Sequence, residues 1–242
     1  MIGTVEMPPN TGEVSHWDEW NTKFRQWGTF SDEPTMRRMR EALAAVRDLR
    51  LSAPNILEVG CGTGWLTAKL AEFGTVMGVD LGAETIRAAA EKLPGIEFRA
   101  GDILQLDLPG NHFDIVVTLE TLSHIADKDA FMDKMVHVLR PGGTLILTTQ
   151  NKFVFDRCDV APNIGWTREW VTMARLKHLL HSKFSISRAT SLDPKGHKGI
   201  LKVVNSAKLN RLFAAIIGES RVKRLKEAAG FGQTLFVVAV RR

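Results

Sequence analysis

Short apolar runs alternate with amphipathic stretches along most of the chain after residue 54. The apolar runs predict seven strands, at residues 56–59, 75–79, 96–98, 113–119, 144–149, 184–189 and 234–240. Helical patterns lie between them, near residues 66–73, 84–93, 128–139 and 167–181. Strands that are apolar along most of their length are typical of a parallel sheet covered on both faces. The alternation therefore predicts an α/β fold with a doubly wound, mostly parallel sheet.

The residues before this pattern form two further segments. Residues 1–30 hold half of the six tryptophans, at positions 17, 20 and 27, among polar side chains. This composition is expected of a segment that docks on the domain and serves as a lid over its site. Ser31-Asp32-Glu33-Pro34 then predicts the start of a helix that runs to about Leu51. We therefore expect a lid at 1–30 and one domain at 31–242.

The overall composition is that of a globular protein, with 44% hydrophobic and 24% charged residues in 242. The two cysteines cannot form a disulfide framework, which favours a reducing compartment. No apolar run approaches the length of a membrane span, and the first twenty residues lack the features of a secretory signal. A cytoplasmic protein is expected.

The net charge of +5 is concentrated near the C-terminus, where residues 183–242 carry 13 Lys/Arg and 3 Asp/Glu. Within this region, residues 199–230 predict a basic helical insert whose first part, 200–217, is amphipathic. Such a stretch could contact a membrane surface, cover an acceptor pocket, form a homodimer face or pack on its own sheet. Aromatic residues are sparse there, which argues against nucleic acid as a partner.

The sharpest local signal is the run LEVGCGTGW at residues 57–65, which follows a predicted strand and opens a helix. Glycines at such a turn let a ligand approach the backbone, at the edge of the sheet where α/β proteins bind ligands. Asp80 ends the next strand, where a carboxylate can accept both hydroxyls of a ribose.

Two ligands fit a loop of this kind, a nicotinamide dinucleotide and S-adenosylmethionine. Trp65 stands where the dinucleotide fingerprint requires its third glycine. Glu58, two residues before the loop, would repel a pyrophosphate but suits the ammonium and sulfonium of S-adenosylmethionine. The residues therefore favour S-adenosylmethionine, with S-adenosylhomocysteine as the product.

Five segments in order, LEVGCGTGW, GVD, AGDI, FDIVVTLETLSHI and LRPGGTLILTT, resemble the consecutive motifs of class I S-adenosylmethionine-dependent methyltransferases of the small-molecule type. The core motifs are similar to those of ubiquinone-pathway O-methyltransferases. The resemblance covers residues 55–150 and implies a Rossmann-like methyltransferase fold with an N-terminal helical lid. It also implies that the last strand, 234–240, runs antiparallel to its neighbours.

The resemblance assigns the methionine part of the ligand to residues near the first and fourth strands. The backbone of Gly60 and Gly62 would line it, and Glu58 would order its ammonium group. Leu119 and Glu120 would lie beside it, at the end of the fourth strand. Glu58 could alternatively serve as a partner that caps a helix.

The resemblance assigns the adenosine part to the ends of the second and third strands. Asp80 would bind the ribose hydroxyls, and Leu81 would pack on the adenine. Asp102 would accept a hydrogen bond from the adenine amino group, and the Ile103 N–H would meet a ring nitrogen. Leu81 and Ile103 could instead be plain core residues.

On the acceptor side, His124 follows the fourth strand and is the leading candidate for a general base. A structural role for this residue is the alternative, and His16 in the lid is a second candidate. No metal site is expected, because Asp127 and Asp129 precede a helix and suit its N-terminus.

The sequence thus predicts methyl transfer to a small-molecule acceptor, most simply O-methylation of a phenol, hydroxyl or carboxylate. N-methylation of an amine or amino sugar, and a non-catalytic module that only binds S-adenosylmethionine, are the alternatives.

Overall fold

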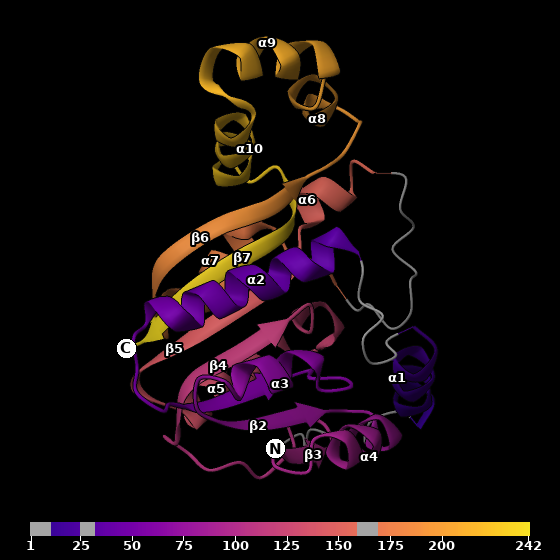
Figure 1. Cartoon of the computed structure of the whole chain (residues 1–242), viewed down its shortest axis with the longest axis vertical. Coiled ribbons are helices and arrows are strands. Elements are labelled where there is room, and N and C mark those ends of the chain that lie inside the picture. The colour runs from indigo at the N-terminus through magenta and orange to yellow at the C-terminus, as the bar shows by residue number, and fades with distance from the viewer. Residues whose placement is uncertain (1–10, 25–31, 159–168) are drawn as a thin grey trace, which may run out of the picture.

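A seven-stranded sheet forms the centre of the molecule in the computed structural model, which describes residues 11–24, 32–158 and 169–242 (Figure 1). The strands are β1 Asn55–Val59, β2 Thr75–Asp80, β3 Glu97–Ala100, β4 Phe113–Leu119, β5 Leu139–Gln150, β6 Phe184–Pro194 and β7 Gly232–Arg241. Their order is β3-β2-β1-β4-β5-β7-β6, and within this sheet β7 alone runs opposite to the other six strands. The expected doubly wound α/β fold, including the antiparallel last strand, is confirmed.

The helices of the described residues are α1 Thr11–Phe24, α2 Glu33–Asp48, α3 Trp65–Leu70, α4 Ala83–Lys92, α5 Lys128–Val138, α6 Lys152–Phe155, α7 Met173–His181, α8 Ile200–Val204, α9 Ala207–Ile217 and α10 Glu219–Ala228. A short 3₁₀ helix, η1, spans Leu122–His124. α2 begins where the sequence predicts, because the Asp32 side chain accepts a hydrogen bond from the Thr35 N–H at 2.9 Å. It ends at Asp48, three residues before the expected Leu51.

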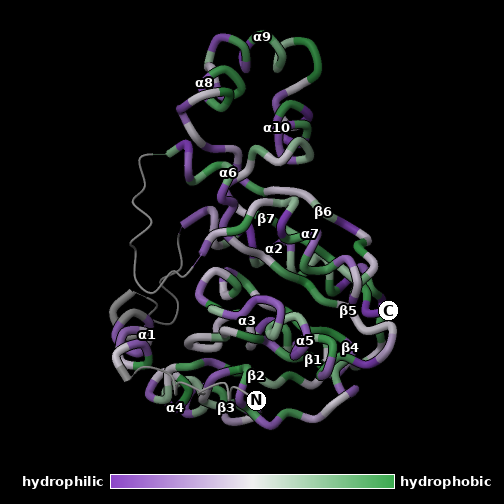
Figure 2. The backbone as a smooth tube through the Cα atoms, turned by 180° about the vertical axis from the view of Figure 1, so that it is seen from behind, coloured by the Kyte–Doolittle hydropathy of each residue, from purple (hydrophilic) through white to green (hydrophobic). Residues whose placement is uncertain are grey.

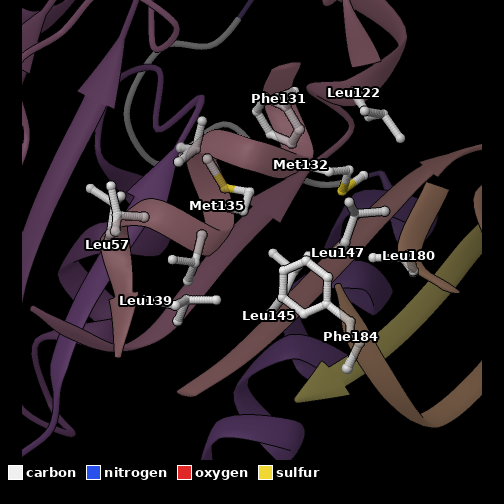
Figure 3. Packing of buried hydrophobic residues seen from close by; sticks show 14 of the residues in the cluster. Leu57, Leu122, Phe131, Met132, Met135, Leu139, Leu145, Leu147, Leu180 and Phe184 are labelled. Atoms are coloured by element: carbon white, nitrogen blue, oxygen red, sulfur yellow. The ribbon is translucent and has the colours of Figure 1, made fainter. Parts of the chain in front are cut away.

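Two hydrophobic layers sandwich the sheet. On one face, α2 and α3 pack on residues of β1, β4, β5 and β7, among them Ile56, Ile115 and Phe236. On the other face, α5 and α7 bury their apolar sides against the same strands. Figure 3 shows this second layer, in which Phe131, Met132 and Met135 of α5 face Leu145 and Leu147 of β5. The sheet is therefore covered on both sides, which explains the continuous apolar runs of its strands.

Other element boundaries also differ from the sequence-based expectation. β5 begins at Leu139 rather than residue 144, because Leu139 pairs with Phe113 before a register shift in β4. β6 extends to Pro194 because it stays paired with β7 as far as Gly232. α7 begins only at Met173, since the Thr172 side chain caps it. The expected start near residue 167 lies outside the described residues, as does Trp27 of the expected lid.

Helices α8, α9 and α10 occupy the stretch where a basic helical insert was expected. They connect β6 to β7 and project beyond the end of the sheet (Figure 1). None of the helices that the structure describes has the length and apolar character needed to cross a bilayer.

Candidate active site

The direction of winding changes at the carboxyl ends of β1 and β4. From β1 the chain winds outward to β2 and β3, and it then returns to place β4 on the other side of β1. In open α/β sheets this switch point is where ligands bind. The loops that leave β1, β2 and β4 here carry most of the residues predicted from the sequence.

The loop after β1 is held tightly against β2 and β4. Gly60, with φ of +77°, donates its N–H to the Val79 carbonyl at 2.8 Å. A Cβ at this position would collide with Oγ1 of Thr121, which itself hydrogen-bonds the Val59 carbonyl at 3.1 Å. Both the backbone conformation and the lack of space therefore require glycine here.

The carboxylate of Asp80 is fixed by two backbone donors at the end of β2. One oxygen accepts the Gly62 N–H at 2.8 Å, and the other accepts the Gly82 N–H at 3.1 Å. Each carboxylate oxygen can accept a further hydrogen bond, so the group is oriented yet can still receive donors from a ligand. Asp80 is half-buried, so part of its side chain is exposed.

Glu58 lies beneath the same loop, with only 3% of its surface exposed. Its Oε2 accepts a hydrogen bond from Oγ1 of Thr67 in α3 at 2.5 Å. Burial raises the pKa of Glu58 to about 8, with a smaller rise from the Asp80 charge and an opposing effect of the Thr67 hydrogen bond. A carboxyl group with this pKa is ready to ionise when a cation binds nearby.

Asp102 follows β3 on a loop that is joined to Asp80, since the Gly101 N–H donates to the Asp80 carbonyl at 2.9 Å. Its Oδ1 accepts the Leu104 N–H at 2.9 Å. The Ile103 side chain, 6% exposed, belongs to the hydrophobic core, so only its backbone could meet a ligand. Leu81 is half-buried beside Asp80.

At the end of β4, the side chain of Glu120 is turned toward β5 and α2. Glu120 has a φ of +63°, an uncommon conformation for a residue with a side chain. Oγ1 of Thr148 donates to its Oε1 at 2.9 Å, and Nε of Arg38 lies 3.9 Å from the same oxygen. Leu119 packs on the α2 and α3 layer. The backbone turn at Glu120 directs the following residues, Thr121 to His124, toward the glycine loop and α1.

Helix α1 lies across this edge of the sheet and brings residues that the sequence patterns did not single out. Asp18 Oδ1 accepts hydrogen bonds from the N–H and Oγ1 of Thr85 at 2.9 and 2.8 Å, in the first turn of α4. Asn21, 6% exposed, lies over Gly62, where a Cβ would be 3.1 Å from its Oδ1. In the sequence, only the clustering of tryptophans indicated that this segment docks on the domain.

The same helix covers His124. The ring of Trp17 meets the imidazole edge-on, with 4.5 Å between the ring centroids, and the His16 ring centroid lies 5.2 Å from that of Trp17. The leading base candidate, the second candidate and one lid tryptophan are thus neighbours, although they come from two segments a hundred residues apart.

Two further residues near this edge, Cys61 and Asp127, have contacts that indicate a structural role. Cys61 is 1% exposed, and burial raises the pKa of its thiol well above the usual value, so it is a neutral packing residue. Asp127 accepts the Ala130 N–H at 2.9 Å and caps α5. Within the described ranges, no group of three His, Cys, Asp or Glu residues is close enough to hold a metal ion.

The chemistry of this edge suits S-adenosylmethionine. Asp80 lies beside the loop, and Glu58 beneath it can ionise when a cation binds, so the site disfavours a dinucleotide pyrophosphate and suits a ligand with two positive centres. Asp80 ends β2, and Asp102 lies two residues after the end of the neighbouring β3, as a ribose diol and an adenine amino group would require.

Comparisons with known proteins agree with this chemistry. Residues 57–147 match the family model described as methyltransferase domain. The chain is 34% identical over 161 residues to a ubiquinone biosynthesis O-methyltransferase of Chelativorans sp., covering 59% of this chain and 63% of that protein. It is 30% identical over 171 residues to the enzyme of the same name from Brucella anthropi, covering 63% of this chain and 68% of that protein. The matched region thus spans about two thirds of these relatives.

Solved structures extend the likeness to nearly the whole chain. The N-methyltransferase NodS from Bradyrhizobium japonicum, determined with S-adenosyl-L-homocysteine, superposes with a TM-score of 0.66 at 16% identity and covers 95% of this chain and 98% of that one. At this identity the likeness concerns the fold. Together with the matched family and the relatives, it establishes that the chain is a member of the S-adenosylmethionine-dependent methyltransferases, an enzyme for which S-adenosylmethionine is the methyl donor.

Proposed function

We propose that the enzyme methylates a hydroxyl oxygen of a small-molecule acceptor, with His124 as the general base. The observation that carries the proposal is the contact between Trp17 and His124. It places an imidazole and an aromatic ring side by side at the carboxyl edge of β4, under a helix that covers the site. A small acceptor can be enclosed there and deprotonated.

The residues around the loop are proposed to hold the methyl donor. Asp80 would accept the ribose hydroxyls, Asp102 the adenine amino group, and the backbone of Gly60 and Gly62 would line the methionine part. Glu58 would act from beneath the loop on the ligand ammonium group. When bound, S-adenosylmethionine supplies an electrophilic methyl group on a sulfonium.

The adjoining residues have less direct roles in this proposal. The Ile103 N–H and the Leu81 side chain would complete the adenine site. Leu119 would lie beside the methionine part. Glu120, tied to Thr148 and Arg38, would act mainly by fixing the turn that carries His124.

Positioning and deprotonation would share the catalysis. Transfer from a sulfonium is an in-line displacement, and holding the reactants in line can contribute ~7–11 kcal/mol in model systems. A hydroxyl must also lose its proton, and a positioned base contributes roughly 10²–10⁴-fold. Closure by α1 would exclude water from both reactants.

Oxygen is the preferred acceptor atom because the ubiquinone biosynthesis relatives named above are O-methyltransferases. N-methylation is the second candidate, since the fold of the N-methyltransferase NodS is the same. An amine that is neutral at the working pH needs no base to accept a methyl group. Loss of His124 should therefore slow O-methylation of a hydroxyl but not N-methylation of such an amine.

A panel of acceptors tests the proposal. S-adenosylhomocysteine formation should be measured with matched phenols, carboxylates and amines, and the methylated atom should be identified by NMR of the product. We expect turnover with a hydroxyl or phenol acceptor and a strong dependence on His124. Turnover restricted to amines, or S-adenosylmethionine binding without turnover against the whole panel, would contradict the proposal.

A further inference from the structure

The α8–α10 insert is anchored through its last helix. The Glu227 side chain of α10 is 5% exposed and accepts a hydrogen bond from the Arg37 guanidinium of α2 at 2.9 Å, and Asp193 of β6 binds the same guanidinium at 2.9 Å. The Ser191 hydroxyl of β6 donates to the Glu227 carbonyl at 2.7 Å. α10 is therefore fixed to the sheet, and it carries α9 on its outer side (Figure 1).

Helix α9 has an apolar side that nothing in the described parts of the chain covers. None of its eleven residues is buried. Four large apolar side chains recur at the spacing of one helix face, and we call them the α9 stripe: Leu209, Leu212, Phe213 and Ile216, which are 37, 57, 51 and 71% exposed. Ile200 and Val203 of α8 are also exposed, by 54 and 58%.

The α9 stripe faces away from the rest of the insert. Asn210, Arg211 and Ala214, on the opposite side of α9, line a pocket of about 690 Å³ shared with α10 and the end of β6. The polar side of the helix therefore faces its own protein, and the apolar side faces outward. Figure 2 shows hydrophobic stretches in α8 and α9, at the tip of the molecule.

The charge around the stripe is almost entirely positive. Residues 195–230 carry nine Lys/Arg and two Asp/Glu, and one of the two acids is the buried Glu227. α8 and α9 contain no acidic residue, and their cations Lys202, Lys208 and Arg211 are exposed. These three make no ion pair with any residue that the structure describes.

We propose that the outer face of α8 and α9 is a docking surface for an anionic lipid bilayer. An outward apolar face bordered by exposed lysines, here Lys202 and Lys208, is the arrangement that binds in the plane of a membrane interface. The apolar side chains would enter the acyl boundary while the cations meet the lipid headgroups. A second copy of the chain fits less well, because paired stripes would bring Lys202 and Lys208 close to the same cations of the other copy.

Docking there would orient the active site. β7 is antiparallel to both β5 and β6, so β6 runs parallel to β1 and β4. The insert therefore rises from the same edge of the sheet as the glycine loop and His124. The bound enzyme would turn its acceptor edge toward the bilayer. The proposal concerns binding and does not depend on the chemistry of the acceptor.

Vesicle sedimentation of the full chain tests the surface. We expect the protein to sediment with vesicles of phosphatidylcholine containing phosphatidylglycerol, to stay in solution with phosphatidylcholine alone, and to lose binding as salt increases. The double variant Leu212→Ser/Ile216→Ser should weaken binding at least tenfold. Leu225→Ser, on α10 and 62% exposed, is the control outside the stripe and should bind normally.

Charge is tested with a matched pair of double variants. Lys202→Gln/Lys208→Gln should weaken vesicle binding by roughly 30-fold, since each cation contributes about a factor of five near the surface. Lys69→Gln/Arg87→Gln removes the same net charge from exposed positions on α3 and α4 and should change binding little. S-adenosylhomocysteine binding, measured by calorimetry, reports folding of every variant.

Two results would overturn the proposal. One is the absence of sedimentation with phosphatidylglycerol vesicles at low salt, or sedimentation that the α9 variants leave unchanged. The other is a dimer in light scattering that Leu212→Ser/Ile216→Ser converts to monomers, which would assign the surface to a second copy. Neither result would touch the proposed O-methylation, which the acceptor panel measures separately.

Discussion

Trp17 and His124 meet edge-on with 4.5 Å between their ring centroids, although 106 residues separate them in the sequence. One comes from α1 and the other from the 3₁₀ turn after β4. The contact joins the helix that covers the carboxyl edge of the sheet to the residue proposed to take the acceptor proton. Because of this contact, substitutions in α1 should change the activity of the enzyme.

Removing residues 1–30 should leave a folded core but abolish turnover, because the hydrophobic layers of the sheet lie outside this segment. Trp17→Ala alone should lower kcat/KM by about tenfold or more, since water would enter beside His124. Trp17→Phe keeps a ring there and should retain most of the activity. Thermal melts and steady-state kinetics measure both effects. Full activity of the truncated protein would mean that α1 is only an appendage.

Asp80 should matter for binding rather than for stability alone. Asp80→Asn keeps the size of the side chain but removes a charge-assisted acceptor, and S-adenosylhomocysteine affinity should fall by ~1–3 kcal/mol. Asp48→Asn, at the exposed end of α2, is the control with the same chemical change. Calorimetry gives both dissociation constants. An unchanged affinity in folded Asp80→Asn would remove Asp80 from the ribose site.

Gly60 should tolerate no side chain. Gly60→Ala places a Cβ against Oγ1 of Thr121 and requires a residue with φ of +77°. We expect a loss of stability of about 1–3 kcal/mol and loss of cofactor binding. Adding Thr121→Ala should recover part of the stability, since it removes the collision with Oγ1 but neither the tight contact with the Cβ of residue 121 nor the backbone strain. Gly95→Ala, where nothing lies within 4 Å, should be silent, and denaturant unfolding compares the variants. Equal stability of Gly60→Ala and the native protein would contradict this account of the loop.

Glu58 should make the stability of the ligand-free protein fall as pH rises. Its pKa is raised from 4.5 to about 8 in the folded protein, so the folded state holds a proton that the unfolded state releases. The stabilisation is present in full below about pH 4.5 and is lost as pH increases toward 8, with a slope of at most ~1.4 kcal/mol per pH unit. Glu58→Gln should flatten this dependence.

The measurement is denaturant unfolding between these two pH values. Glu72→Gln, in the exposed turn after α3, is the matched control and should leave the slope of the native protein unchanged. A slope that persists in Glu58→Gln would mean that another group is responsible.

The sheet and the glycine loop could be predicted from the sequence because their signals are local. Each strand is a single apolar run, and Asp80 and Asp102 come shortly after strands that the pattern already marks. The start of β5 could not be predicted, since Leu139 is in a strand only through its pairing with Phe113. At such a junction, a short apolar run fits the end of a helix as well as the start of a strand.

The lid contacts were beyond prediction for a different reason. Asp18 caps α4 and Asn21 lies over Gly62 through the docking of one element on another, which leaves no periodic trace in the sequence. The turn of Glu120 toward Thr148 is likewise set by tertiary contacts. The position of Glu120 beside the methionine part of the ligand, which the resemblance implies, stays a prediction.

His124 is the most consequential of these assignments for the chemistry. If it removes the acceptor proton, His124→Ala should lower kcat by about 10²-fold or more and leave cofactor affinity nearly unchanged, because its role begins only in the transition state. His178→Ala, on the exposed side of α7, is the control and should be fully active. Stopped-time assays of S-adenosylhomocysteine formation and calorimetry separate the two effects. A loss of less than about threefold would leave positioning alone to explain the rate, and it would favour an acceptor that is already deprotonated at neutral pH, such as a carboxylate.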